Sequence, residues 1–284
     1  MAYTEAMSQP IRAKKYWSQN FFQDPELLAL SLDPLELETT DTVIEVGPGQ
    51  GILTELLLER VQRVIAIEVD PQLFARLRQQ YAHEPRLELL HQDVMRTDFR
   101  ELLADVPWSR RKLVANIPYH LTTPLLHKAL NIPALTQPLN ADTPIFADIG
   151  LMVQKEVADK LVAQPGEKAY GVLSIQAHFA AENEILSILP RHLFQPQPKV
   201  DSAFVRLQPR QSMPISSTDL NAYWQLVQAI YQQRRKTLRN VLRKMGHSSE
   251  SLELLSAEFD LGLRGEVFGL EDLARLNNAR LKLT

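Results

Sequence analysis

The sequence TVIEV at 42–46 runs directly into GPGQG at 47–51, and this stretch decides the fold of the chain. The first five residues are mostly apolar and predict a buried strand. Apolar residues at helical spacing from 52 to 60 predict a helix directly after the glycines. Strand, glycine-rich turn and helix in this order open a Rossmann-like α/β fold, in which ligands bind at the carboxyl ends of the strands. We therefore expect a mostly parallel sheet flanked by helices, with a cofactor over residues 47–51.

The spacing of Gly47, Gly49 and Gly51 favours one class of cofactor. Dinucleotide folds use GxGxxG, with the pyrophosphate at the N-terminus of the helix. Here the pattern is GxGxG and Glu45 precedes it, which suits a nucleoside cofactor that has no pyrophosphate. A turn without side chains lets a sulfonium group and an amino-acid tail approach the backbone closely. A plain connection between strand and helix needs no such alternation, so we favour the nucleoside cofactor.

Two further predicted strands lead to acidic residues that suit such a cofactor. The apolar run 64–67 ends at Glu68, 17 residues after Gly51. An acid about 20 residues after the glycine loop can meet ribose hydroxyls, and both hydroxyls of a diol can donate to one carboxylate. The run 87–90 leads to Asp93, which can accept a hydrogen bond from an adenine amine or cap the following turn. The sequence leaves these two roles of Asp93 open.

The tetrapeptide Asn116-Ile117-Pro118-Tyr119 follows a fourth apolar run at 112–115. Asn supplies one acceptor and two donors, Pro fixes the turn, and Tyr offers a flat apolar face. An amide beside an aromatic plate on a rigid corner can hold a planar ring that carries nitrogen. A turn with a packed Tyr is the alternative for the tetrapeptide alone. The glycine loop, Glu68 and Asp93 supply the context that favours a binding site.

The composition limits the classes of protein to which the chain can belong. Its 284 residues are 45% hydrophobic, include no Cys and hold seven scattered His. Disulfides, thiolate metal sites and a Cys nucleophile are therefore excluded, and we expect no metal. Every apolar run is shorter than the ~18 residues of a membrane span, and the N-terminal residues are polar. We expect a cytoplasmic monomer that does not enter a membrane.

Charge divides the chain into two parts, 1–209 and 210–284, which we predict to be two domains, the second of them helical. The second part holds 11 Lys and Arg against 8 Asp and Glu, whereas the first holds 20 against 26. In the first part, 172–189 and 199–207 are expected to form the later strands. In the second part, helices are predicted at 220–231, 236–245, 252–255 and 270–281.

Six cations without an acid between them gather in the C-terminal part, and these are Arg234, Arg235, Lys236, Arg239, Arg243 and Lys244. Spacing of four residues predicts that Arg235, Arg239 and Arg243 share one face of a helix. A run of charges is usually a solvated helix face, but six cations without an acid favour contacts to phosphate. Such contacts position a nucleic acid without reading its sequence.

Together, these motifs resemble those of the S-adenosylmethionine (SAM)-dependent rRNA adenine N(6)-dimethyltransferases. The long segment at 152–207 favours the small-subunit rRNA branch over its large-subunit sibling. The sequence departs from the family pattern at Ser18, at His120 and in the segment 133–148, which is longer than usual. The matching stretches are SQNF at 18–21, EVGPGQG at 45–51, IEVD at 67–70, QDV at 92–94, NIPYHLTTPLL at 116–126, MVQKEVADKLVAQPGEKAYGVLS at 152–174, FQPQPKVDSAFVRL at 194–207 and RRKTLRNVL at 234–242.

The resemblance implies transfer of methyl groups from SAM to the exocyclic amines of two adjacent adenines in small-subunit rRNA, which become dimethylated during ribosome biogenesis. S-Adenosylhomocysteine would be the other product, and the partner would be small-subunit rRNA or the pre-ribosomal small subunit. The methionine end of SAM would lie by the glycine loop, the ribose by Glu68 and the cofactor adenine by Asp93. The implied site residues are, for the cofactor, Gln19, Asn20, Gly47, Gly49, Gly51, Glu68, Val69, Asp93, Val94 and Asn116, and, for the target adenine, Asn116, Tyr119 and Phe194.

The exocyclic amine of adenine is a poor nucleophile because its lone pair is delocalised into the ring. Asn116 Oδ1 and a backbone carbonyl of Ile117 or Pro118 can accept its two N–H groups and favour a tetrahedral nitrogen. No strong base is required, since the methylated amine becomes acidic and loses its proton to water. The adenine must be single-stranded or flipped out of a duplex. Tyr119 and Phe194 can stack on its faces through their rings, at about 1–3 kcal/mol per base, although Phe194 can equally be a core anchor.

Two alternatives remain open from the sequence. The chain can be a large-subunit rRNA adenine methylase of the antibiotic-resistance branch, or a SAM-binding ribosome assembly factor whose catalysis is dispensable. A nicotinamide-dependent oxidoreductase is disfavoured by the GxGxG spacing and by the missing acid–base partner.

Overall fold

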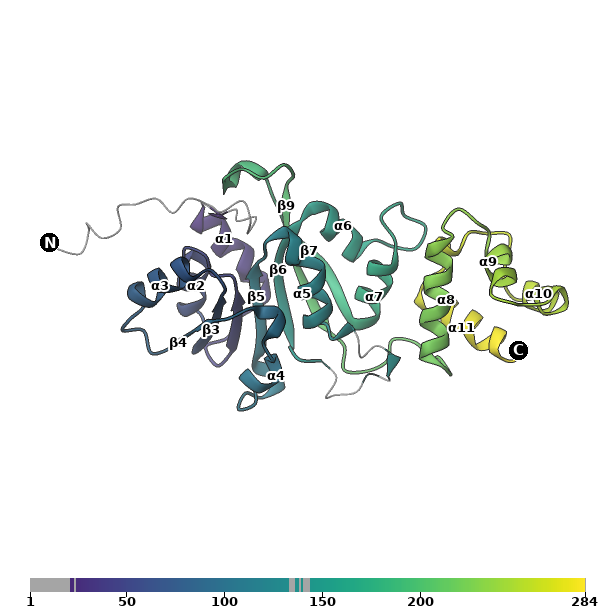
Figure 1. The fold of residues 1–284 in the computed structure, drawn as a ribbon, viewed down its shortest axis with the longest axis horizontal. Coiled ribbons are helices and arrows are strands. Elements are labelled where there is room, and N and C mark those ends of the chain that lie inside the picture. The colour runs from purple at the N-terminus through teal and green to yellow at the C-terminus, as the bar shows by residue number, and fades with distance from the viewer. Residues whose placement is uncertain (1–20, 23, 133–135, 138, 140–143, 284) are drawn as a thin grey trace.

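The centre of the protein is a seven-stranded sheet in the order β4-β3-β2-β5-β6-β9-β7, and β1 and β8 form a separate antiparallel pair. Figure 1 shows β3 and β4 toward one end of the molecule and the helices α8 to α11 at the other, beyond α7. Gln19 and Asn20 lie outside the residues that the computed structural model describes, which are 21–22, 24–132, 136–137, 139 and 144–283. The strands are β1 Phe21–Phe22, β2 Thr42–Val46, β3 Arg63–Glu68, β4 Leu87–His91, β5 Arg111–Asn116, β6 Asp148–Gln154, β7 Ala181–Leu189, β8 Phe194–Gln195 and β9 Ser202–Pro209.

The five strands from β2 to β6 are parallel, which confirms the predicted Rossmann-like class. The strand β2 lies between β3 and β5, so the chain changes its direction of winding at β2, and ligands bind at such switch points. The helices α1 and α2 cover one face around Val43 and Val114, and α4 to α7 cover the other around Ile44 and Leu113. The helices are α1 Pro25–Leu32, α2 Ile52–Leu58, α3 Pro71–Gln80, α4 Phe99–Leu102, α5 Thr122–Ala129, α6 Lys155–Val162 and α7 Val172–Ala180.

The prediction of strands throughout 172–189 is wrong in its first half. Residues 172–180 form α7, and the strand β7 begins only at Ala181. Five residues of this nine-residue helix are buried, and a short, almost continuously apolar run does not distinguish a buried strand from a buried helix. The strand β9 is confirmed and lies antiparallel between β6 and β7. Because β9 is antiparallel to β6, the loop before β9 lies at the carboxyl ends of the parallel strands, where the predicted site residues lie.

The C-terminal part is helical, as predicted. Asp219 starts its first helix by accepting a hydrogen bond from Ala222 N at 2.9 Å. The helices are α8 Leu220–Gln232, α9 Leu238–Lys244, α10 Ser249–Ser256 and α11 Leu270–Leu281. Within the described ranges, no helix combines the length and the apolar character needed to cross a bilayer.

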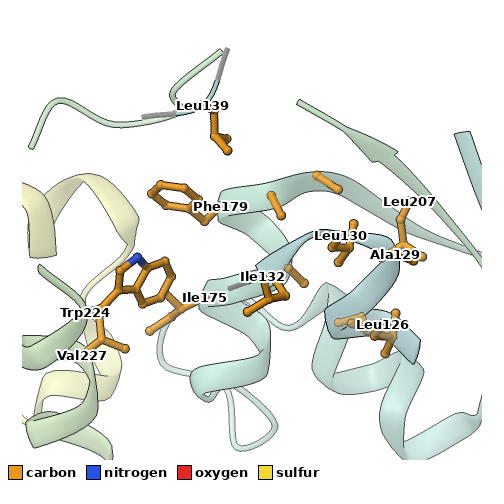
Figure 2. Packing of buried hydrophobic residues seen from close by; sticks show 14 of the residues in the cluster. Leu126, Ala129, Leu130, Ile132, Leu139, Ile175, Phe179, Leu207, Trp224 and Val227 are labelled. Carbon is orange, nitrogen blue, oxygen red and sulfur yellow. The ribbon is translucent and has the colours of Figure 1, made fainter. Parts of the chain in front are cut away.

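The helical part is joined to the sheet part by a continuous apolar core. Trp224 and Val227 of α8 lie toward Ile175 and Phe179 of α7 (Figure 2). The rings of Phe179 and Trp224 meet edge to face, with centroids 5.2 Å apart at 61°. The domain boundary between 209 and 210 stays a prediction, and the shared core fixes the helical part against α7.

Candidate active site

A cavity of about 370 Å³ opens at the carboxyl ends of the central strands, in the size range of small-molecule sites. The strand ends of β2, β3 and β5 and the turn after β4 contribute its walls, as expected at a switch point. The predicted site residues that line it are Gly47, Gly49, Glu68, Val69, Asp93, Val94, Asn116, Tyr119 and Phe194. Gly51 does not line it, and the predicted contacts of Gln19 and Asn20 lie outside the described residues.

The glycine loop has a backbone that only glycine adopts easily. Gly47, Gly49 and Gly51 have φ angles of +67°, +61° and +89°. A Cβ atom at Gly47 would meet no atom within 4 Å, so this part of the loop is open to a ligand. At Gly51 a Cβ atom would lie 3.0 Å from both Leu77 Cδ2 and Tyr81 Oη, and Tyr81 Oη donates to Gly51 O at 3.1 Å. Gly51 therefore serves the packing of the loop on α3, while Gly47 and Gly49 face the cavity.

Glu68 is fixed at the end of β3 with its carboxylate in the cavity wall. It is 4% exposed, and burial raises the pKa of its carboxyl. Its Oε1 accepts from Asp70 N at 2.8 Å, and its Oε2 accepts from Gly49 N at 3.3 Å. Backbone N–H groups therefore hold this carboxylate in place at the cavity wall.

Asp93 caps the short turn after β4. Its Oδ1 accepts from Met95 N at 2.8 Å and starts the 3₁₀ helix Val94–Arg96. The capping role that the sequence left open is confirmed. The role toward an adenine amine is untested, and the second oxygen of Asp93, 3.9 Å from Arg96 Nε, can still accept a hydrogen bond.

The tetrapeptide at 116–119 forms a rigid corner at the end of β5. Asn116 pairs with Met152 in the sheet, and the next amide, Ile117 N, donates to Met152 O at 3.4 Å. Pro118 turns the chain into a 3₁₀ helix that begins at Tyr119, and its carbonyl accepts from Leu121 N at 2.8 Å. This bond uses one of the two lone pairs of Pro118 O, so both carbonyls predicted to accept from an amine keep a lone pair and we favour the Ile117 carbonyl.

Tyr119 and Phe194 both contribute to the cavity wall from different elements. The hydroxyls of Tyr119 and Ser202 share a hydrogen bond at 3.1 Å, and burial raises the pKa of the Tyr119 phenol. Phe194 is 3% exposed and meets Phe22 edge to face, with centroids 5.1 Å apart at 78°. Phe194 is therefore a core residue that also lines the cavity, and its stacking on an adenine stays a prediction.

Glu45 also lines the cavity, although the sequence indicated it only as an acid before the glycines. It is fully buried; Thr54 Oγ1 donates to its Oε2 at 2.7 Å, and its Oε1 has no partner among the described residues. Burial raises the pKa of Glu45 to about 8, and the nearby Glu68 carboxylate adds to this rise. An acid in the middle of an otherwise apolar strand was the signal in the sequence.

The six C-terminal cations do not form one helical face. Arg235 lies in a turn and α9 begins only at Leu238, because Thr237 adopts an extended conformation and pairs with Arg264. Arg234 forms an ion pair with Glu266 and donates to Lys168 O at 2.8 Å. The shared helical face of Arg235 with the later arginines is therefore a wrong prediction, and Arg234 serves the contact between the two parts of the chain.

Arg239 also has partners within the protein, since it donates to Glu253 Oε1 at 2.9 Å and to Ser256 Oγ at 2.6 Å. The four remaining cations are exposed and have no acidic partner within the described residues. We call them the basic patch, and they are Arg235, Lys236, Arg243 and Lys244.

Comparison with known proteins gives the family of the chain. Residues 11–262 match the family described as ribosomal RNA adenine dimethylase. Ribosomal RNA small subunit methyltransferase A of Geobacter metallireducens is 39% identical over 279 residues, which cover 96% of this chain and 97% of that protein. The protein of the same name from Geobacillus thermodenitrificans is 37% identical over 278 residues, which cover 95% and 92%.

Solved structures share the fold. A dimethyladenosine transferase from Plasmodium falciparum superposes with a TM-score of 0.71 at 23% identity, covering 90% of this chain and 95% of that one. The 23S rRNA methyltransferase ErmE superposes with a TM-score of 0.66 at 24% identity, covering 93% and 98%. From the family match and the relatives of nearly equal length, we conclude that the chain belongs to the ribosomal RNA adenine dimethylase family.

Proposed function

We propose that the protein transfers methyl groups from SAM to the exocyclic amines of adenines in small-subunit ribosomal RNA, two adjacent adenines being dimethylated, and that S-adenosylhomocysteine leaves as the other product. The observation that carries this proposal is the single cavity in which the glycine loop and Glu68 lie with Asn116, Tyr119 and Phe194. The names of the relatives of nearly equal length favour the small-subunit substrate over the large-subunit alternative.

The residues present fit a nucleoside cofactor of this kind. The space at Gly47 is open, and the Glu68 carboxylate, which lies in the same cavity lining, can accept from a ribose diol. Glu45 lines the same cavity and its buried Oε1 has no partner among the described residues, so a cationic ligand nearby would favour the ionised form of its carboxyl. Asp93 and Val94 would hold the cofactor adenine, and Gln19 and Asn20 would hold the methionine end together with the glycine loop.

SAM supplies the methyl group in this proposal, and the chain positions the nitrogen that receives it. Asn116 Oδ1 and Ile117 O accept the two N–H groups of the target amine and localise its lone pair. Tyr119 and Phe194 hold the faces of the flipped adenine. No residue acts as a strong base, because the proton leaves after transfer, when the nitrogen is acidic.

The helical part at 210–284 is proposed to hold RNA through the basic patch. Its four exposed cations have no acidic partner within the described residues, so their charge is available to phosphates. The apolar core between α7 and α8 fixes the patch relative to the cavity. Binding there would position the RNA, and the cavity would select the base.

Methylation assays test the proposal. Labelled methyl from SAM should enter undermethylated small-subunit RNA or assembling small subunits, and large-subunit RNA should remain unlabelled. Mass spectrometry of the modified fragment should find dimethyladenosine at two adjacent positions. Folded protein that binds SAM but labels neither small-subunit substrate would contradict the proposal. Label in large-subunit RNA alone would favour the other branch of the family.

A further inference from the structure

The hydroxyl of Tyr119 has a partner from a distant part of the chain. Ser202 is fully buried at the first position of β9, where it pairs with Gln154 of β6 and Leu189 of β7. Its Oγ lies 3.1 Å from Tyr119 Oη, and the two residues are 83 positions apart in sequence. A side chain held between two neighbouring strands is a rigid support for the ring that it contacts.

The residue before Ser202 closes the loop that carries Phe194. Asp201 Oδ1 accepts from Arg191 N at 3.0 Å, and Asp201 O accepts from Lys155 N at 2.9 Å. Arg191 also donates from Nη1 to Lys199 O at 3.3 Å, inside the same loop. Two consecutive residues therefore fix both aromatic walls of the cavity, Ser202 through the Tyr119 hydroxyl and Asp201 through the base of the Phe194 loop.

We propose that Ser202 is a positioning residue, which sets the angle of the Tyr119 ring against Phe194 through the hydrogen bond between the two hydroxyls. The proposal rests on the stacking role of Tyr119 in the proposed function. A ring without this bond can still stack, but it turns about its χ angles and presents the adenine amine over a wider range of directions. Displacements of about 1 Å can slow an oriented reaction by about 100-fold, so loss of one orienting bond should slow transfer measurably. The Tyr119 hydroxyl thus gains a role that the sequence did not indicate.

A double-mutant cycle tests this inference. We expect Ser202→Ala and Tyr119→Phe each to slow single-turnover methyl transfer to small-subunit particles by roughly 5- to 20-fold. The double variant should be no slower than the slower single variant, because both changes remove the same bond. Affinities for SAM and for RNA should stay within about twofold of wild type, and Ser202→Thr should recover part of the rate. The inference is wrong if the double variant is slowed by the product of the two single factors, or if Tyr119→Phe transfers methyl groups at the wild-type rate.

A matched control separates positioning from general stability. Ser187 of β7 shares a hydroxyl pair with Ser31 of α1 at 3.2 Å and does not line the cavity. Ser187→Ala should lower the melting temperature to a degree similar to Ser202→Ala and leave the rate of transfer unchanged. If Ser202→Ala does not fold, Tyr119→Phe still removes the bond and decides the question. Full activity of Tyr119→Ala would instead contradict the stacking role in the proposed function.

Discussion

Gly49 N donates to Glu68 Oε2 at 3.3 Å, so the glycine loop after β2 and the acid at the end of β3 form one unit. This bond helps to fix the carboxylate that we propose accepts from a ribose diol. Glu68→Gln should weaken SAM binding by about 10- to 100-fold in calorimetry, because an amide cannot make the same charge-assisted bonds. Glu88→Gln is the matched control, since Glu88 pairs with Arg63 at 2.8 Å away from the cavity. Equal affinities of the two variants would exclude the ribose role.

Glu45 should make the cofactor-free protein less stable as pH rises from about 5 to 8. Burial raises the pKa of Glu45 to about 8 from 4.5, so over this range the folded state retains a proton that the unfolded chain has lost. Stability then falls by up to about 1.4 kcal/mol per pH unit for one proton. The groups near this carboxyl are Thr54, Glu68 and Tyr81, and burial raises the pKa of Glu68 as well, which acts in the same direction.

Glu45→Gln should flatten this dependence while it keeps an acceptor for Thr54 Oγ1. Urea unfolding of both proteins at several pH values measures the difference in slope. Parallel profiles for wild type and variant would show that Glu45 does not retain its proton in the folded state.

Asn116→Ala should abolish most methylation and leave RNA binding intact. The rate of transfer should fall by about 100- to 1,000-fold, because the variant loses the acceptor that localises the amine lone pair. Titrations should give an unchanged affinity for RNA, and any loss of SAM affinity should be small beside the loss of rate, because Asn116 is also among the residues implied for the cofactor. In cells, loss of function with this variant supports the enzyme, whereas normal ribosome assembly would support the factor whose catalysis is dispensable.

Gly47→Ala and Gly51→Ala should have different effects although both positions have positive φ angles. At Gly51 the added methyl group would meet Leu77 and Tyr81, so Gly51→Ala should lose more stability than Gly47→Ala. The positive φ angle alone should cost on the order of 1–3 kcal/mol at either position. At Gly47 the methyl group points into open space, so this variant should lose SAM affinity in excess of its loss of stability. Thermal unfolding and calorimetry on both variants measure the two effects, and identical behaviour would contradict the assignment.

Neutralising Arg235 and Arg243 together should weaken RNA binding and flatten its dependence on salt. Each lost phosphate contact should reduce the slope of log affinity against log salt by about 0.7–0.9. SAM affinity should not change. Arg275→Gln is the control, because Arg275 already pairs with Glu258 at 2.9 Å. A slope that stays at the wild-type value would show that the basic patch is a solvated surface without phosphate contacts.

The sequence by itself determined the order of elements around the glycine loop. Alternation of apolar strands with helical spacing predicted the parallel sheet, and acids placed just after strands predicted Glu68 and Asp93 at its carboxyl edge. These patterns are local, so a single chain segment is enough to carry them. The error at 172–180 has the same origin, since a short apolar run satisfies either period.

Only the tertiary structure decided which side chains have partners. Tyr119 and Ser202 are 83 residues apart, and Arg239 is paired with Glu253 from a neighbouring helix, so no local pattern reveals either contact. The same holds for Gly51, whose need for a small residue comes from Leu77 on α3 and from Tyr81 directly after this helix. Periodicity reports which face of an element is buried, but a hydrogen bond depends on positions that only the packed chain brings within 3.5 Å.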